Sequence, residues 1–316
     1  MSDRMRFVGP LDRALFLKTL PFFTRLPISD LAVLAHHLRE RFFRKGSVVL
    51  RQGEPIGAMY IIVEGSLRTV GGERAREAVL GPEQGVGFLS FLSRSQEGVR
   101  AIAEVDTLTL ELDTDVLLDV YEDHFPILHH AIRSIATRML QARMQTPDGA
   151  FFGEHATDAP APERSLDLVE RIRFVRNGSI FQRANLDTVA QMARVLREVR
   201  VDAGTPLWSS GDRADSTLLI VSGTVRCALD DGARAFLCGP SYPLGNLESI
   251  ARYPRWYDAV AHTPLVGLRA DTESFFDILE DHFEIAMALV SGMASGLIQI
   301  LRQEETDAER DPSPAN

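Results

Sequence analysis

FRKGSVVLRQGEPIGAMYIIVEG, residues 43–65, is the stretch that decides the fold. Three of its four glycines, Gly46, Gly53 and Gly65, divide it, and short β-branched and aromatic runs lie between them. Such runs predict short strands, here at Val48–Leu50 and Met59–Val63. Glycine at each corner permits the positive φ or close backbone approach that a sharp turn requires. The stretch therefore predicts strands joined by tight turns.

The same glycine pattern recurs 158 residues later, at Gly204, Gly211 and Gly223. The register holds without a gap as far as a shared Glu-Asp-His-Phe sequence at 122–125 and 280–283. A fixed period over this length is the signature of a tandem repeat. The chain is therefore one unit written twice.

Helices are expected on both sides of the β segment. The patterns predict helices over 11–20 and from Asp30 to Arg39, with Ser29 as the N-cap of the second and Asp187 as its counterpart in the second repeat. Asp113 is expected to open a long helix that runs to Arg143. Further strands are predicted at 66–70, 77–80, 100–105 and 107–112.

The last helix of each repeat carries an apolar stripe at 3-4 spacing. This spacing is typical of a helix that pairs with another helix. It predicts a dimer-like contact, within one chain or between chains, through Phe125, Leu128, Ile132, Ile135, Phe283, Val290, Met293 and Leu297. The alternative is that each stripe faces its own β domain.

The predicted domains are 1–145 and 164–305. Between them, residues 146–163 combine proline, glycine and acidic residues and predict a linker. Residues 306–316 predict a disordered acidic tail.

Composition narrows the class of protein. The net charge of −10 and pI near 5.3 argue against nucleic-acid binding, which needs a basic face. No run of eighteen apolar residues and no signal-peptide core occur, so no membrane partner and a cytoplasmic location are expected. Cys227 and Cys238 are expected to be buried free thiols in strands.

Nothing in the chain predicts catalysis. The adjacent pairs His36-His37 and His129-His130 fall on predicted helices, where neighbouring side chains face different ways. No nucleophile–base set, phosphate-binding loop or metal-ligand spacing occurs. The sequence therefore predicts a non-enzyme without a cofactor or metal.

The repeat resembles the cyclic nucleotide-binding domain of bacterial catabolite activator proteins and of protein kinase A regulatory subunits. The resemblance rests on the glycine spacing, the strand pair MYIIVEGSLR at 59–68, the strand end LELD at 110–113 and the helix after it. It implies an α+β fold, with two tandem eight-stranded β-rolls of jelly-roll type, each flanked by helices. It also implies a phosphate-binding cassette between later strands. There a glutamate after a glycine holds the ribose hydroxyl, and an arginine ten residues after that glycine pairs with the cyclic phosphate.

The first cassette departs from the family pattern. Gly87 is kept, Phe88 stands at the glutamate position, and Glu97 stands where the resemblance places the arginine. A carboxylate repels a phosphate. Arg94 and Arg100 are each three residues away, which on a strand changes the face. The first pocket is therefore expected to be degenerate.

The second cassette keeps the arginine, as Arg255, ten residues after Gly245. Asn246 replaces the glutamate, with Glu248 nearby, and Trp256 replaces a small residue. A guanidinium is well suited to hold a cyclic phosphate. The tentative ligand-binding set is Gly245, Asn246, Leu247, Glu248, Arg255 and Trp256. The alternative is that Arg255 is a structural arginine.

Two functions follow. The first is a bacterial regulatory or signal-transduction protein whose second repeat binds a cyclic nucleotide or another phosphate ligand through Arg255. The second is a ligand-independent scaffold for protein–protein interaction. A protein partner is expected in both, because no output domain is recognised. A helix-turn-helix transcription factor is not expected, since only a short acidic tail follows Arg302.

Overall fold

The computed structural model describes residues 7–72, 77–94, 98–145, 161–229, 232 and 234–310. By its internal contacts the chain separates into two compact units. Unit 1 comprises Met1–Ala131 and Val290–Asn316, and unit 2 comprises Ile132–Leu289. Each unit is described by itself.

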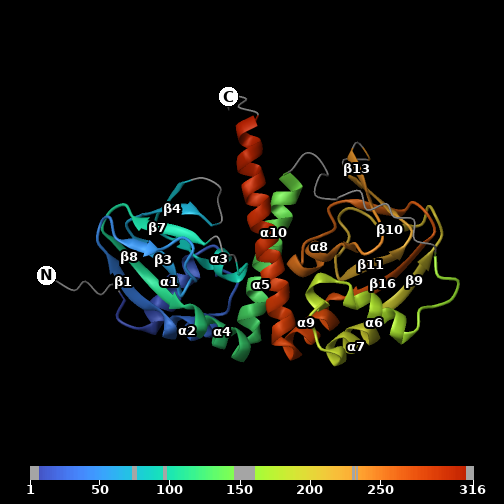
Figure 1. The fold of residues 1–316 in the computed structure, drawn as a ribbon, viewed down its shortest axis with the longest axis horizontal. Helices are drawn as coiled ribbons and strands as arrows, with labels where there is room; N and C mark the ends of the chain where they lie inside the picture. The colour runs from blue at the N-terminus through green and yellow to red at the C-terminus, as the bar shows by residue number, and fades with distance from the viewer. Residues whose placement is uncertain are drawn as a thin grey trace. The chain divides into compact units, whose positions relative to one another are not determined.

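Unit 1 contains two antiparallel sheets among its described residues, with strand orders β1-β8-β3-β6 and β2-β7-β4-β5 (Figure 1). The strands are β1 (Arg39–Phe43), β2 (Val48–Leu50), β3 (Ala58–Glu64), β4 (Leu67–Gly71), β5 (Ala78–Leu80), β6 (Gly85–Val86), β7 (Val99–Ala103) and β8 (Thr107–Asp113). The helices that begin in this unit are α1 (Pro10–Thr19), α2 (Ile28–His37), α3 (Phe88–Leu92), α4 (Thr114–Asp123) and α5 (Phe125–Gln145).

Unit 2 repeats this topology, with strand orders β9-β16-β11-β14 and β10-β15-β12-β13 (Figure 1). Its strands are β9 (Arg197–Val201), β10 (Pro206–Trp208), β11 (Ser216–Ser222), β12 (Val225–Leu229), β13 (Arg234–Cys238), β14 (Pro243–Leu244), β15 (Asp258–Ala261) and β16 (Leu265–Asp271). Its helices are α6 (Leu168–Arg176), a 3-10 turn at Ser179–Phe181, α7 (Leu186–Val195), α8 (Asn246–Ala251), α9 (Thr272–Asp281) and α10 (Phe283–Arg310).

The core of each roll lies between its two sheets. In unit 1 it contains Leu50 and Leu67 from one sheet and Ile62 and Val86 from the other. Alternation of buried and exposed residues along β4 directs Leu67 inward, as the two-residue period of a strand requires. The resemblance to an α+β tandem β-roll is therefore confirmed in both units.

The corner glycines have the predicted conformation. All six glycines of the repeated pattern have φ between 80° and 91°, the left-handed region that favours glycine. At Gly223 a Cβ would lie 2.3 Å from the carbonyl oxygen of Pro264, so this corner also requires close backbone approach. Cys227 and Cys238 are free, buried and on strands, as predicted.

The predicted helix caps were wrong. The N-cap of α2 is Pro27, and Ser29 lies inside the helix. In the second repeat the cap of α7 is Asn185, whose side chain accepts a hydrogen bond from the Thr188 amide, and Asp187 lies in the first turn. An oxygen three residues before an amide is well placed to cap it.

Two other boundaries also differ from expectation. Arg39 begins strand β1, which the sequence analysis missed because Phe42 on that strand is exposed and no clear alternation marks it. Asp113 caps α4 as expected, through hydrogen bonds from the amides of Asp115 and Val116. The helical stretch after it is interrupted at His124, where α5 follows.

The long helices α5 and α10 are each divided between the units. Residues from Ile132 onward in α5 belong to unit 2, and residues from Val290 onward in α10 belong to unit 1. In unit 1 the Ser295 hydroxyl lies 3.4 Å from the Ser93 carbonyl oxygen, and Arg302 donates to the Gly72 carbonyl oxygen at 2.8 and 3.2 Å. Unit 1 is therefore completed by the C-terminal part of α10, and unit 2 includes the C-terminal part of α5.

The predicted seam residues are buried on these helices. Leu128, Ile132, Ile135, Val290, Met293 and Leu297 are all less than 9% exposed, and Phe125 and Phe283 are half-buried. Pairing of the two stripes stays a prediction, as does the linker over 146–163, most of which lies outside the described residues. Helix α10 includes residues 306–310, which the sequence analysis assigned to the tail, and residues 311–316 are not described.

Part of α10 also has the length and composition of a membrane span. Among the described residues it is Phe283–Gln303, with a mean hydropathy of 1.6. Half of this window is buried inside the molecule, as in the core helix of many globular proteins. Length and composition alone do not separate the two roles.

Candidate functional site

The second cassette lies between β14 and β15 of unit 2. Gly245 follows β14 in the left-handed conformation (φ 74°) and places the first residue of α8. The helix ends at Ala251, and its C-cap residue Arg252 is also left-handed (φ 52°). The chain then returns through Arg255, whose amide donates to the Asp212 carbonyl oxygen at 2.8 Å. This return brings the Arg255 side chain back towards Gly245.

Arg255 is buried, with 3% of its surface exposed. Its Nη1 donates to the Gly245 carbonyl oxygen at 2.9 Å and its Nη2 donates to the Ser216 carbonyl oxygen at 2.6 Å. The guanidinium lies 4.1 Å from the ring centre of Trp208. Its Nε is buried without a hydrogen-bond partner among the described residues. Burial lowers the pKa of the guanidinium, and nearby Glu248 acts in the opposite direction.

Glu248 points into the same interior, with 3% of its surface exposed. Burial raises the pKa of this carboxyl group, while Arg255 and hydrogen bonds from the Trp256 and Tyr257 side chains lower it. Because burial is the largest effect, the pKa of Glu248 lies above that of an exposed glutamate.

The remaining predicted residues of this cassette have local contacts. The Asn246 side-chain oxygen accepts from the Leu247 amide at 2.9 Å, and Leu247 is buried. Trp256 is half-buried and packs against the core of the roll. The structure thus brings Gly245, Glu248 and Arg255 together, whereas the Asn246 side-chain oxygen accepts within its own turn. Their role in binding a ligand stays a prediction.

Two neighbours of Arg255 were missed by sequence reasoning. The Trp208 ring covers the guanidinium, and the Ser216 carbonyl oxygen accepts a hydrogen bond from it. Tyr257, which like Trp256 stands where the resemblance places a small residue, has a side-chain hydrogen bond with Glu248. One signal was present: Trp208 occupies the position of Leu50 in the first repeat, 158 residues earlier. An aromatic ring at that position supplies a face for a cation.

The first cassette has a different interior. Gly87 is left-handed (φ 94°), and a Cβ there would meet Leu50 Cδ1 at 3.3 Å rather than an arginine. Phe88 makes an edge contact with Phe22, with ring centres 5.3 Å apart. Ser90, at the position of Glu248, is buried, and its hydroxyl has no hydrogen-bond partner among the described residues. Glu97, predicted to oppose a phosphate, lies outside the described residues.

The second cassette contains polar groups in the interior of unit 2 that are unsatisfied within the described residues. Within the described ranges no group of three or more His, Cys, Asp and Glu side chains is placed to hold a metal ion. Two buried donors, Arg255 Nε and Trp208 Nε1, have no acceptor in the described part of the unit. A group with acceptor oxygens would satisfy such donors.

The chain matches the sequence model of one family in both repeats. The family is the cyclic nucleotide-binding domain, matched over residues 40–124 and 198–282, which together make up over half of the chain. A cyclic AMP receptor protein of Thermus thermophilus is 25% identical over 129 residues, which cover 40% of this chain and 59% of that protein. A CRP-like cAMP-activated global transcriptional regulator of Mycobacterium tuberculosis is 25% identical over 180 residues, or 54% of this chain and 77% of the regulator.

Solved structures with similar folds include protein kinase A regulatory subunits. For cAMP-bound PfPKA-R the identity is 14%, the TM-score is 0.36, and the match covers 88% of this chain and 86% of that one. For the regulatory subunit of a cAMP-independent protein kinase A from Trypanosoma brucei the identity is 16% and the TM-score is 0.34. The match covers 95% of this chain and 93% of that one.

Proposed function

The chain belongs to the cyclic nucleotide-binding domain family, with two such domains in tandem, and on this premise we propose that it is a non-enzymatic regulatory protein whose second domain binds a phosphate-bearing ligand at Arg255. A cyclic nucleotide is the first ligand to test. The first domain does not bind such a ligand in the family manner. The output passes to a protein partner, and a cytoplasmic, bacterial setting is part of the proposal.

The observation that carries the proposal is the buried, poorly neutralised guanidinium of Arg255. Its partners are two neutral carbonyl oxygens and the Trp208 ring, and none of its described contacts is an ion pair with a carboxylate. An uncompensated buried charge costs several kcal/mol. A phosphate that reaches Nε would supply both the missing charge and the missing acceptor.

Calorimetric titration of the full chain tests this proposal. Cyclic AMP, cyclic GMP and cyclic di-GMP are titrated separately into the wild type, Arg255→Lys and Arg197→Ala. Arg197 is a matched control because it is an exposed arginine of the same unit, ion-paired with Asp271. Binding by the wild type and the control, weakened at least tenfold in Arg255→Lys, is expected because lysine lacks the planar fork. Equal binding by all three variants contradicts the assignment to Arg255.

Trp208 favours a second candidate, the ligand-independent scaffold. Its ring covers one face of the guanidinium at 4.1 Å and fills space beside Gly245. If none of the three nucleotides produces heat with the wild type or with Trp208→Leu, which installs the residue of the first repeat, the scaffold function is favoured.

A further inference from the structure

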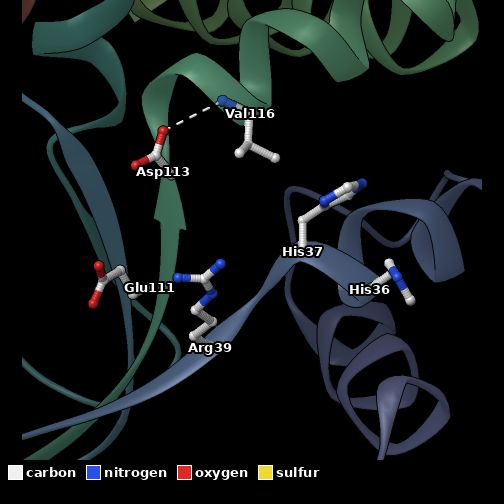
Figure 2. Close-up of a pocket in the computed structure, with 6 residues that line it drawn as sticks. All are labelled: His36, His37, Arg39, Glu111, Asp113 and Val116. Atoms are coloured by element: carbon white, nitrogen blue, oxygen red, sulfur yellow. Dashed lines mark hydrogen bonds between the residues drawn. The ribbon is translucent and has the colours of Figure 1, made fainter.

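A hollow of about 250 Å³ lies in unit 1, and no residue of the first cassette lines it. It is lined by His36, His37, Arg39, Glu111, Asp113 and Val116, which come from the end of α2, the start of β1, the end of β8 and the first turn of α4 (Figure 2). Neither the predicted ligand set nor the proposed function uses these residues.

Both carboxylates of the lining already have partners. Glu111 forms an ion pair with Arg41, in which Glu111 Oε2 lies 2.6 Å from Arg41 Nε. Asp113 accepts hydrogen bonds from the amides of Asp115 and Val116 at 2.9 and 3.3 Å, and Figure 2 shows its carboxylate turned towards the first turn of α4. Neither carboxylate pairs with Arg39 in the described structure.

The basic residues of the lining are differently placed. Arg39 has no ion pair or hydrogen bond from its guanidinium within the described ranges. His36 and His37 contact each other edge to face, with ring centres 5.5 Å apart. The hollow therefore presents the Arg39 guanidinium without a hydrogen-bond partner in the described part of the chain, two imidazoles, and two carboxylates that are bonded to other groups.

The second repeat shows the alternative arrangement. The counterparts of Arg39 and Asp113 are Arg197 and Asp271, which pair with each other at 3.5 Å. Asp271 makes no side-chain capping bond to α9. In unit 1 the aspartate caps its helix instead, and the arginine is left for another acceptor. Two histidines, absent from the second repeat at these positions, stand beside it.

We propose that this hollow in unit 1 is a second ligand site, which holds the phosphate or carboxylate group of a small molecule between Arg39 and the two histidines. A guanidinium binds such an oxyanion through two parallel N–H donors. The volume suits a single charged group with a short substituent rather than a whole nucleotide, since pockets for larger ligands begin at about 300 Å³.

The test uses the full chain and inorganic phosphate as the probe, with acetate as a second arm. The imidazole C–H resonances of His36 and His37 are followed by NMR at constant pH and ionic strength, with chloride as the balancing salt. We expect saturable shifts with phosphate, acetate or both, and the arm that saturates identifies the class of oxyanion. Arg39→Ala is expected to weaken binding at least tenfold, whereas Arg197→Ala leaves it unchanged.

Arg39 and Arg197 are both exposed, so both variants are expected to keep the fold, and the dispersion of their amide spectra checks this. Arg39→Lys, which keeps the charge but loses the fork, is expected to bind with intermediate affinity. Shifts that rise linearly without saturation, or equal affinity in the wild type and Arg39→Ala, overturn the proposal.

Discussion

The two cassettes share a backbone and differ in what fills it. In both, a left-handed glycine follows a short strand and starts a short helix. The second encloses ionisable groups, Arg255 and Glu248, whereas the first encloses Ser90 and has a half-buried Phe88 packed against Phe22. The comparison indicates that the β-roll determines the backbone path of the cassette. The side chains buried inside the cassette determine whether its interior contains charged groups.

The largest effect is expected from alanine at the two cassette glycines. Both substitutions strain a left-handed backbone, at a cost of roughly 1–2 kcal/mol. At Gly245 the new Cβ would also lie 2.0 Å from Arg255 Nη1, so the buried guanidinium must leave its carbonyl partners. Gly245→Ala is therefore expected to lose about 3–5 kcal/mol beyond this strain, the cost of breaking a buried charged contact.

Gly87→Ala is the matched control in the first cassette, where the nearest atom to the new Cβ is a leucine methyl at 3.3 Å. Hydrogen exchange measured on peptides from each unit reports the two losses separately. Equal losses in the two units would show that Arg255 is not fixed in place as described.

A smaller effect, and one that depends on pH, is expected from Glu248→Gln. Burial raises the pKa of Glu248 in the folded protein. A carboxyl group with a raised folded pKa stabilises the native state fully below its unfolded pKa and loses that contribution as the pH rises through the folded value. The wild type is therefore expected to lose stability relative to Glu248→Gln as the pH rises from 4.5, the ordinary pKa of the carboxyl, through its raised pKa in the folded protein. The loss is about 1.4 kcal/mol for each unit of pKa shift.

Ser90→Ala supplies the comparison from the first cassette, because a serine hydroxyl does not titrate in this range. Urea unfolding across the same pH series measures both variants against the wild type. A difference between wild type and Glu248→Gln that stays constant with pH would mean that the buried carboxyl is not perturbed.

The smallest effect is expected where α10 contacts unit 1. Arg302→Ala removes two donors from the Gly72 carbonyl oxygen. A hydrogen bond from a charged group contributes about 1.5–3 kcal/mol, and partial exposure places this one at the lower end. We expect faster amide hydrogen exchange near Gly72 and Ser93 in Arg302→Ala. The control variant Gln303→Ala, at an exposed neighbouring residue, is expected to show no change. If the exchange rate near Gly72 does not change in Arg302→Ala, this hydrogen bond does not stabilise the contact between α10 and unit 1.

The sequence was sufficient to predict the fold of the two β-rolls. It was not sufficient to predict which residues surround Arg255 inside the second cassette. The turns at Gly46 and Gly204 can be predicted from the sequence because only glycine adopts positive φ freely, which is a local property. The partners of Arg255 are not local. Ser216 lies 39 residues away, and no spacing rule relates a buried guanidinium to a backbone carbonyl on another strand. Trp208 was detectable only by setting one repeat against the other.

The division of α5 and α10 between the units has a consequence for synthesis of the chain on the ribosome. Unit 1 includes residues from Val290 onward, which are made after the whole of the second roll. During synthesis the first roll must wait with its docking surface for α10 uncovered, while domains usually fold as their sequence emerges. The order in which the rolls are translated is therefore not the order in which they are finished, and the first to appear is the last to be complete.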